Sequence, residues 1–355
     1  MTSKERIILT LEHKETDRIP MIDGFWGTTI QRWHKEGLPQ GKSPSEYFEF
    51  DGMASIGVDI SFQVSGGVIE ETDDYVISKS SWGVVSKNMK HTTSAPQHID
   101  FLVKDRKSFQ ENRWRLAYNE SRVNFDQALA TFENAQESGV FLNYGGGGLG
   151  FDIWQNVVGV TNILIGMKDD PEWVKELYMA NVDLHITLVE ELMARGIEFD
   201  GAYFTDDLGY VNGPFFSPAI YREQLFPAHK KLCDFLNSRG IKVILHSCGG
   251  VRPLVPMFVL AGFTCLEPLE VKAGMNLIEL KKNFSDKLAF MGGIDVRAMA
   301  DSNPAVISEE IRQKITVAKQ GGGYIFHSDH SIPDNVSFQQ YQRVIKLVRE
   351  YGRYQ

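Results

Sequence analysis

The chain has 355 residues, 43% of them hydrophobic, so it can bury a large core as one α/β barrel or as two ordinary domains. A formal net charge of −9 argues against nucleic-acid binding, which normally requires a basic stripe. The N-terminal residues lack the apolar core of a signal peptide, no apolar stretch approaches the roughly 20 residues that span a bilayer, and three cysteines are too few for a disulfide framework, which together favour a cytoplasmic protein.

Short apolar runs that alternate with amphipathic stretches predict eight strands along the chain. The predicted strands are residues 18–23, 57–62, 140–144, 201–205, 243–246, 264–267, 288–291 and 324–327. The predicted helices are residues 4–12, two stretches within 105–137, and residues 171–195, 217–236, 251–260, 276–284, 304–320 and 337–351. This order favours a TIM barrel with an N-terminal extension, formed by residues 1–355 as one domain.

A different pattern occupies residues 68–95. Tyr75-Val-Ile-Ser and Trp82-Gly-Val-Val alternate apolar and polar positions, which predicts a β-hairpin with one solvated face. We expect this hairpin to be an insertion near the mouth of the barrel.

Metal-binding side chains stand at several predicted strand ends. His246 and Cys248 follow the fifth strand, and Glu270 follows the sixth, with Glu267 as its rival. Because the carboxyl ends of barrel strands converge on one mouth, these residues are candidates to surround a single ion. A thiolate, imidazoles and a carboxylate suit Zn²⁺.

The last predicted strand adds a second histidine to this set. His327 and His330 flank Ser328-Asp329, and one of them should face the ion. We choose His330 because the turn at Pro333 follows it closely, which leaves His327 for substrate contact. Asp329 is a candidate to orient an imidazole or to accept a proton.

Other polar and aromatic residues near strand ends are candidates for catalysis and substrate binding. Asp206 and Asp207, with Tyr210, follow the fourth strand and could supply a general base or a substrate hydrogen bond, although one of the acids could simply cap a turn. Apolar walls for an aromatic substrate would come from Phe25, Trp26, Tyr144 and Trp154. The run Gly145–Gly148 lacks the residues of a phosphate loop and is interpreted as flexible backbone beside a pocket.

Several short motifs, spread over nearly the whole chain, share a family pattern. They are Leu9-Thr-Leu-Glu-His-Lys, Asp17-Arg-Ile-Pro20, His246-Ser-Cys-Gly-Gly250, Pro268-Leu-Glu270, Gly292-Gly-Ile-Asp295 and the segment from Gly321 to Pro333. On these motifs the chain resembles the uroporphyrinogen decarboxylase superfamily, and within it the cobamide-dependent methyltransferases. The decarboxylases carry an Arg-Gln-Ala-Gly-Arg type motif for porphyrin carboxylates, whereas this chain has Gly24-Phe-Trp-Gly27.

The resemblance implies a TIM barrel with zinc bound by a His-x-Cys pair and by a cysteine after the last strand. Here the position of that cysteine looks like His330. Replacing a thiolate by a neutral imidazole makes the site less anionic and the zinc a stronger Lewis acid. The resemblance thus favours transfer of a methyl group from a small methylated compound, such as a methoxyaromatic, to a corrinoid carried by a partner protein.

Two other functions stay open at this point. A metal-free lyase acting on a carboxylated substrate would need cations at the mouth, for which Arg297 and Lys272 are candidates. A non-catalytic barrel could instead bind a ligand or a corrinoid protein. The sequence leaves the oligomeric state open, with a homodimer as one option.

Overall fold

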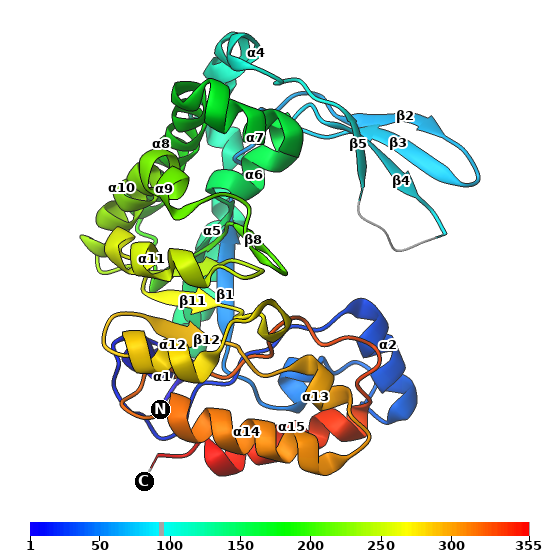
Figure 1. Ribbon diagram of the computed structural model, residues 1–355, viewed down its shortest axis with the longest axis vertical. Coiled ribbons are helices and arrows are strands. Elements are labelled where there is room, and N and C mark those ends of the chain that lie inside the picture. The colour runs from blue at the N-terminus through cyan, green and yellow to red at the C-terminus, as the bar shows by residue number, and fades with distance from the viewer. Residues whose placement is uncertain (92–95, 355) are drawn as a thin grey trace.

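The computed structural model describes residues 1–91 and 96–354, so the end of the predicted insertion, residues 92–95, lies outside the described residues. A sheet of seven parallel strands forms its centre (Figure 1). In sheet order the strands are β1 (Met53–Gly57), β6 (Phe141–Gly148), β7 (Gly201–Thr205), β10 (Lys242–His246), β11 (Cys265–Glu267), β12 (Ala289–Met291) and β13 (Tyr324–Ile325).

The predicted first strand takes the eighth place, beside β13. Met21 forms a parallel bridge with Phe326, and the Ile22 N–H donates to the Phe326 carbonyl at 3.0 Å. This segment pairs only through isolated bridges, and Pro20 within it has no N–H to donate. The arrangement confirms the predicted α/β barrel.

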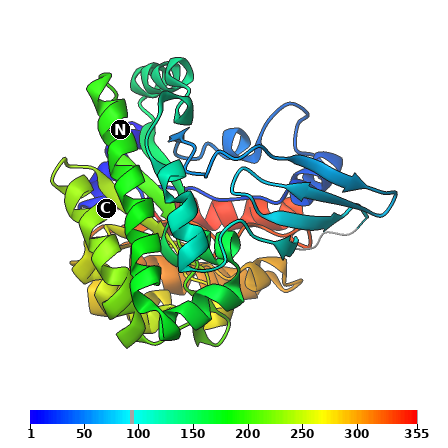
Figure 2. The same cartoon turned by 90° about the horizontal axis from the view of Figure 1, so that it is seen from above.

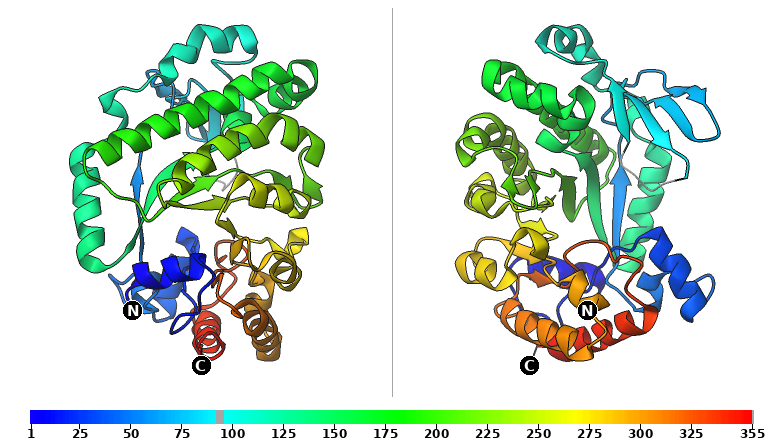
Figure 3. Two further views of the ribbon diagram at one scale, coloured as in Figure 1. Left: turned by 90° about the vertical axis from the view of Figure 1, so that its left-hand side faces the viewer. Right: turned by 45° about the vertical axis from the view of Figure 1, so that its right-hand side comes forward.

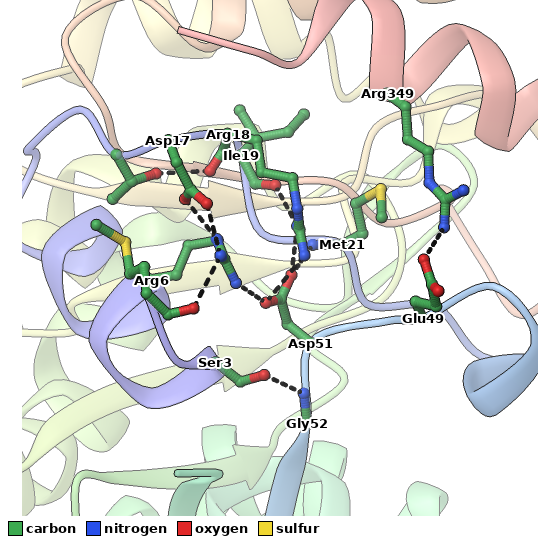
Figure 4. A network of polar contacts seen from close by, with 12 residues as sticks. Ser3, Arg6, Asp17, Arg18, Ile19, Met21, Glu49, Asp51, Gly52 and Arg349 are labelled. Carbon is green, nitrogen blue, oxygen red and sulfur yellow. Dashed lines mark hydrogen bonds and ion pairs between the residues drawn. The ribbon is translucent and has the colours of Figure 1, made fainter.

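A buried ion network joins the first segment to β1 at the base of the barrel (Figure 4). Asp51 accepts hydrogen bonds from Arg6 Nη1 at 2.5 Å, from Arg18 Nη1 at 2.7 Å and from the Met21 N–H at 2.8 Å. Arg6 also pairs with Asp17. Because the Asp51 side chain is only 1% exposed, its charge depends on these partners.

Helix α1 (Ser3–Leu11) closes the same end of the barrel. Its Ile7 and Leu11 pack into a buried cluster that contains Ile244, Cys265 and Ile325 from the strands. The side chains of a strand alternate between its two faces, so the strand residues of this cluster point into the barrel. With the base filled, the open mouth lies at the carboxyl ends of the strands.

The remaining helices cover the outside of the sheet (Figure 3). They are α2 (Gly27–Glu36), α3 (Pro44–Tyr47), α4 (Arg106–Asn112), α5 (Phe125–Ser138), α6 (Gly150–Val158), α7 (Val160–Asp169), α8 (Pro171–Ala194), α9 (Pro218–Ile220), α10 (Phe226–Asn237), α11 (Val255–Ala261), α12 (Leu277–Phe284), α13 (Val296–Ala300), α14 (Pro304–Ala318) and α15 (Phe338–Tyr351). The long predicted helices begin where expected: Asp170, Ser217 and Ser337 each cap a helix start with a side-chain oxygen. None of the helices in the described part of the chain combines the length and apolar character needed to cross a bilayer.

The predicted hairpin insertion is larger than expected. Four antiparallel strands form it: β2 (Gly67–Glu71), β3 (Tyr75–Lys79), β4 (Val85–Met89) and β5 (Gln97–Asp100). This sheet projects away from the barrel helices (Figure 2). It belongs to the connection after β1, which is on the mouth side of the barrel.

Several predicted strands have different bounds in the structure. The second strand is Met53–Gly57 rather than residues 57–62, because Asp59 turns the chain by accepting the Ser61 N–H at 2.8 Å. The eighth strand ends at Ile325 rather than at residue 327. The sixth strand ends at Glu267, as predicted, so Glu270 lies in the loop that follows it. The glycine run 145–148 is part of β6, and a Cβ at Gly146 would lie 2.1 Å from the Phe204 ring, so this position requires glycine.

Candidate metal centre

His246 and Cys248 lie together at the mouth, at the end of β10. Ile244 belongs to the barrel interior, so His246, two residues later, also points inward. His246 Nε2 lies 3.4 Å from Cys248 Sγ. Gly249 then turns the chain with φ +82°, where a Cβ would lie 2.2 Å from the Gly209 carbonyl carbon. The predicted histidine–cysteine pair is therefore present as a close pair.

Asp207 is the third member of the group. Its Oδ1 accepts the Cys248 N–H at 2.8 Å and lies 3.5 Å from His246 Nε2. Within the described residues, Asp207, His246 and Cys248 offer donor atoms that all lie within 4.8 Å of one another. We refer to these three residues as the mouth triad.

Glu267 and Tyr203 support the inner side of His246. Glu267 Oε2 lies 2.5 Å from His246 Nδ1 and accepts the Tyr203 hydroxyl at 2.7 Å. Burial alone would lower the pKa of His246, but Glu267 and Cys248 together outweigh it and raise that pKa to about 11. Burial likewise would raise the pKa of Glu267, but His246, with His327 and Tyr203, outweighs it and holds that pKa below its usual value.

Burial disfavours ionisation of the thiol in the mouth triad. Burial raises the pKa of Cys248, and Asp207 adds to this effect while His246 opposes it. The thiolate is the form that binds metals, and a bound metal ion supplies the positive charge that stabilises it.

The donor set fits zinc. Bonds of about 2.0–2.3 Å in a tetrahedral arrangement imply donor–donor separations of about 3.3–3.6 Å. The observed separations from His246 Nε2, 3.4 Å to Cys248 and 3.5 Å to Asp207, lie in this range. Sulfur, nitrogen and carboxylate oxygen are also the ligands that zinc prefers.

Two residues predicted as metal ligands have other contacts. Glu270 accepts the Gly249 N–H at 2.8 Å with one oxygen and pairs with Lys272 at 2.8 Å through the other. The His330 ring stacks on Trp26 with ring centres 6.0 Å apart. Neither belongs to the mouth triad, whereas Asp207, predicted as a catalytic acid or base, does.

The other two predicted catalytic acids hold the backbone in place. Asp206 is fully buried, accepts the Asp152 N–H at 2.8 Å and lies 3.0 Å from His229 Nε2. Asp329 is 2% exposed and accepts the N–H groups of Val271 and Val296. Both carboxylates are therefore occupied by structural contacts.

The predicted substrate-binding residues divide into buried and exposed groups. Tyr144 and Trp154 are fully buried, so no surface of either remains for a ligand. Phe25 is partly buried and packs between Trp33 and Tyr341 at the edge of the hydrophobic core. By contrast, Trp26 and Tyr210 are about half exposed, at 51% and 47%.

His327, also predicted to contact substrate, lies deeper than expected. Its side chain is 10% exposed, and its Nε2 lies 3.8 Å from Glu267 Oε1. Its Nδ1 lies 2.6 Å from the Ser328 carbonyl oxygen. These contacts place it beside Glu267, on the inner side of the mouth triad.

Asp152 is a mouth residue that the sequence analysis missed. It lies in the first turn of α6, and its carboxylate is 3.5 Å from the Thr205 hydroxyl at the end of β7. Burial, with Asp206 and Asp207 nearby, raises the pKa of Asp152 to about 6. The sequence signal for Asp152 is its position: it is an acidic residue at the start of a helix that directly follows a glycine-rich strand.

One solved structure shares this architecture. A search of curated protein sequences finds no match. Among solved structures, a methyltransferase from Methanosarcina mazei superposes with a TM-score of 0.67 at 14% identity, covering 99% of each chain, and so shares the fold. A glycerophosphoryl diester phosphodiesterase from Parabacteroides distasonis covers 100% of this chain and 94% of its own, at 10% identity and a TM-score of 0.38.

The family model of uroporphyrinogen decarboxylase (URO-D) matches residues 146–351, more than half of the chain. The matched range contains every member of the mouth triad together with Glu267 and Asp152. The chain therefore belongs to the uroporphyrinogen decarboxylase family.

Proposed function

We propose that this protein is a zinc-dependent methyltransferase that moves a methyl group from a small methylated compound to the corrinoid of a partner protein. Methoxylated aromatic compounds are the donor class that we favour. The observation that carries the proposal is the mouth triad, in which a thiol, an imidazole and a carboxylate meet at the open end of the barrel. The shared fold of the Methanosarcina mazei methyltransferase supports the same conclusion.

Asp207, His246 and Cys248 are the proposed protein ligands. Three protein ligands leave a position for substrate, which is the pattern of catalytic rather than structural zinc sites. Glu270 and His330 stay candidates for that fourth position in the absence of substrate. Either would have to leave its present contacts with Lys272 or Trp26.

In the proposed reaction, the bond between the methyl carbon and the donor oxygen breaks as a bond from that carbon to the reduced cobalt of the partner's corrinoid forms. The oxygen keeps the electron pair of the broken bond. Bound zinc would supply a Lewis acid that stabilises this developing negative charge. Asp152, whose carboxylate lies 3.5 Å from the Thr205 hydroxyl, is our candidate to hydrogen-bond a neighbouring hydroxyl of the donor. The exposed rings of Trp26 and Tyr210 are candidates for apolar contacts at the rim.

The lyase alternative loses support from the contacts of its two candidate cations. Lys272 pairs with Glu270 at 2.8 Å, and Arg297 pairs with Asp295 at 2.7 Å, so each charge is already balanced. Gly24-Phe-Trp-Gly27, which stands where the decarboxylases carry their Arg-Gln-Ala-Gly-Arg type motif, contains neither Arg nor Lys. A substrate carboxylate would find few partners at this mouth.

The test begins with metal content, measured by mass spectrometry on protein purified without chelator. We expect about one zinc per chain in the wild type and none in Cys248→Ser. The matched control is Cys233→Ala, which removes a buried thiol of α10 outside the mouth triad and should retain the zinc.

Methyl transfer is then followed by the absorbance change of reduced cobalamin mixed with methoxylated aromatic compounds. We expect the wild type and Cys233→Ala to methylate the cobalamin and Cys248→Ser to be inactive. Wild-type protein that contains no zinc, or that methylates cobalamin equally well after zinc is removed, would contradict the proposal. Zinc binding without transfer from any methylated donor would favour the ligand-binding alternative.

A further inference from the structure

We infer that Glu267 is a positioning residue of the metal site, which acts on the zinc through His246 and is not itself a ligand. This inference rests on the proposed zinc site. It also answers a question that the sequence leaves open, namely whether Glu267 or Glu270 belongs with the metal.

The contacts of Glu267 identify which ring nitrogen of His246 carries the proton. A carboxylate only accepts hydrogen bonds, and Glu267 Oε2 lies 2.5 Å from His246 Nδ1. Glu267 therefore holds the proton at Nδ1, both in the imidazolium and in the neutral imidazole that would bind a metal. The lone pair of the other nitrogen, Nε2, then faces Cys248 and Asp207, as a metal ligand requires.

Tyr203 and His327 hold Glu267 in this orientation. The Tyr203 hydroxyl donates to the same oxygen, Oε2, at 2.7 Å. On the other side, His327 Nε2 lies 3.8 Å from Oε1. Glu267 is only 3% exposed, so both of its oxygens face fixed protein groups rather than solvent.

The position of Glu267 in its strand explains why it reaches His246 and not the open mouth. Glu267 is in register with His246 on the neighbouring strand, and both residues point into the barrel above Ile244 and Cys265. Glu270, three residues later, has left the strand and contacts the Gly249 backbone. The two glutamates therefore have different roles, and only Glu267 contacts a proposed ligand.

The test compares zinc binding by Glu267→Gln, Glu267→Ala, Cys248→Ser, the wild type and the control Cys233→Ala. Zinc stoichiometry is measured at saturating zinc, and zinc affinity by competition with a chromogenic chelator. The visible spectrum of Co²⁺-substituted protein reports the number and type of ligands. Circular dichroism identifies any variant that fails to fold, and Glu267→Gln, which preserves the size of the side chain, keeps the test decisive.

We expect Glu267→Ala to bind one zinc at saturation with an affinity lower by about 10–100-fold, the usual cost of losing a partner behind a metal ligand. Glu267→Gln should fall between Glu267→Ala and the wild type because its amide oxygen still accepts a hydrogen bond from Nδ1. Cys233→Ala should match the wild type, and the cobalt spectra of all three variants should keep the wild-type pattern of ligands.

Two results would overturn the inference while leaving the zinc proposal intact. Loss of stoichiometric zinc and an altered cobalt spectrum in both Glu267 variants, as in Cys248→Ser, would make Glu267 a ligand. Wild-type affinity in both Glu267 variants would show that Glu267 has no role. A wild type that binds no zinc would instead reject the proposed function on which the inference rests.

Discussion

A tyrosine, a histidine and a carboxylate meet at the barrel mouth, and the same three residue types meet again in the layer between the sheet and helix α10. In the inner set, both nitrogens of His229 face the other two residues: Nδ1 contacts the Tyr221 hydroxyl at 2.9 Å, and Nε2 lies 3.0 Å from Asp206. All three residues are fully buried. Burial lowers the pKa of His229 to about 3 and raises that of Asp206, so the inner set favours uncharged forms.

The mouth set uses the same residue types differently. Glu267 and Tyr203 contact only the Nδ1 side of His246, and Nε2 faces Cys248 and Asp207. The His246 side chain is 23% exposed, whereas that of His229 is not exposed at all. A set of polar residues becomes a candidate site when one donor atom faces other potential ligands in a side chain that solvent reaches. Residue type alone does not distinguish the two sets.

The largest expected effect separates two adjacent residues, Asp206 and Asp207. Asp207→Ala removes a proposed ligand, so zinc affinity should fall by more than the roughly 100-fold that loss of an outer partner costs. The free energy of unfolding of the metal-free protein should change by less than about 1 kcal/mol, because the Asp207 side chain is partly exposed. Metal content and urea unfolding of the metal-free protein measure the two effects.

Asp206→Ala is the matched control and should give the opposite result. It leaves the Asp152 N–H and His229 without their buried partner, which should lower the free energy of unfolding by about 2–3 kcal/mol. One zinc should still bind to the folded protein. If Asp206→Ala abolished zinc binding in folded protein while Asp207→Ala retained it, the distinction between the mouth and the inner layer would be wrong.

The positions of the strands that carry these residues were predictable from the sequence. The apolar run 201–205 coincides with β7, and the run ending at His246 coincides with the end of β10. The strands of a barrel must be apolar on both faces and must end at one mouth. For this reason the amino-acid pattern alone was enough to place His246 and Cys248 at the mouth.

The contacts made by loops and the packing of individual side chains were not predictable in the same way. The third member of the mouth triad depends on how the loop after β7 turns, and the Cys248 N–H fixes Asp207 in that loop. Sequence spacing carries no information about such a contact. Similarly, Trp154 would look the same in sequence as a pocket wall or as core, and only the packing of Phe62 and Phe109 around it decides for core.

His185 offers a pH test of a second buried histidine, on helix α8. This residue of α8 is fully buried beside Tyr144, and burial lowers its pKa to about 4. The unfolded chain binds a proton at this histidine below pH ~6.5, which the folded protein resists, so its contribution to stability is present above pH ~6.5 and is lost as the pH falls. Between pH ~6.5 and 4 the loss should reach about 3 kcal/mol.

Urea unfolding of the wild type and of His185→Gln across this pH range isolates the effect, since all other groups are shared. The wild type should lose about 1.4 kcal/mol per pH unit more than the variant. Parallel stability curves would mean that His185 is protonated equally in both states. Burial would then not prevent protonation of His185 in the folded protein.

The smallest expected effect concerns the hydroxyl of Tyr203. Tyr203→Phe removes the hydrogen bond to Glu267 Oε2 but leaves the contact between Glu267 and His246 in place. Zinc affinity should therefore fall only severalfold, less than for Glu267→Ala, and the free energy of unfolding should fall by about 1 kcal/mol. Chelator competition and urea unfolding measure both. A loss of zinc affinity as large as that of Glu267→Ala would mean that Glu267 cannot orient His246 without Tyr203, so that the tyrosine and the carboxylate act on the ligand as one unit.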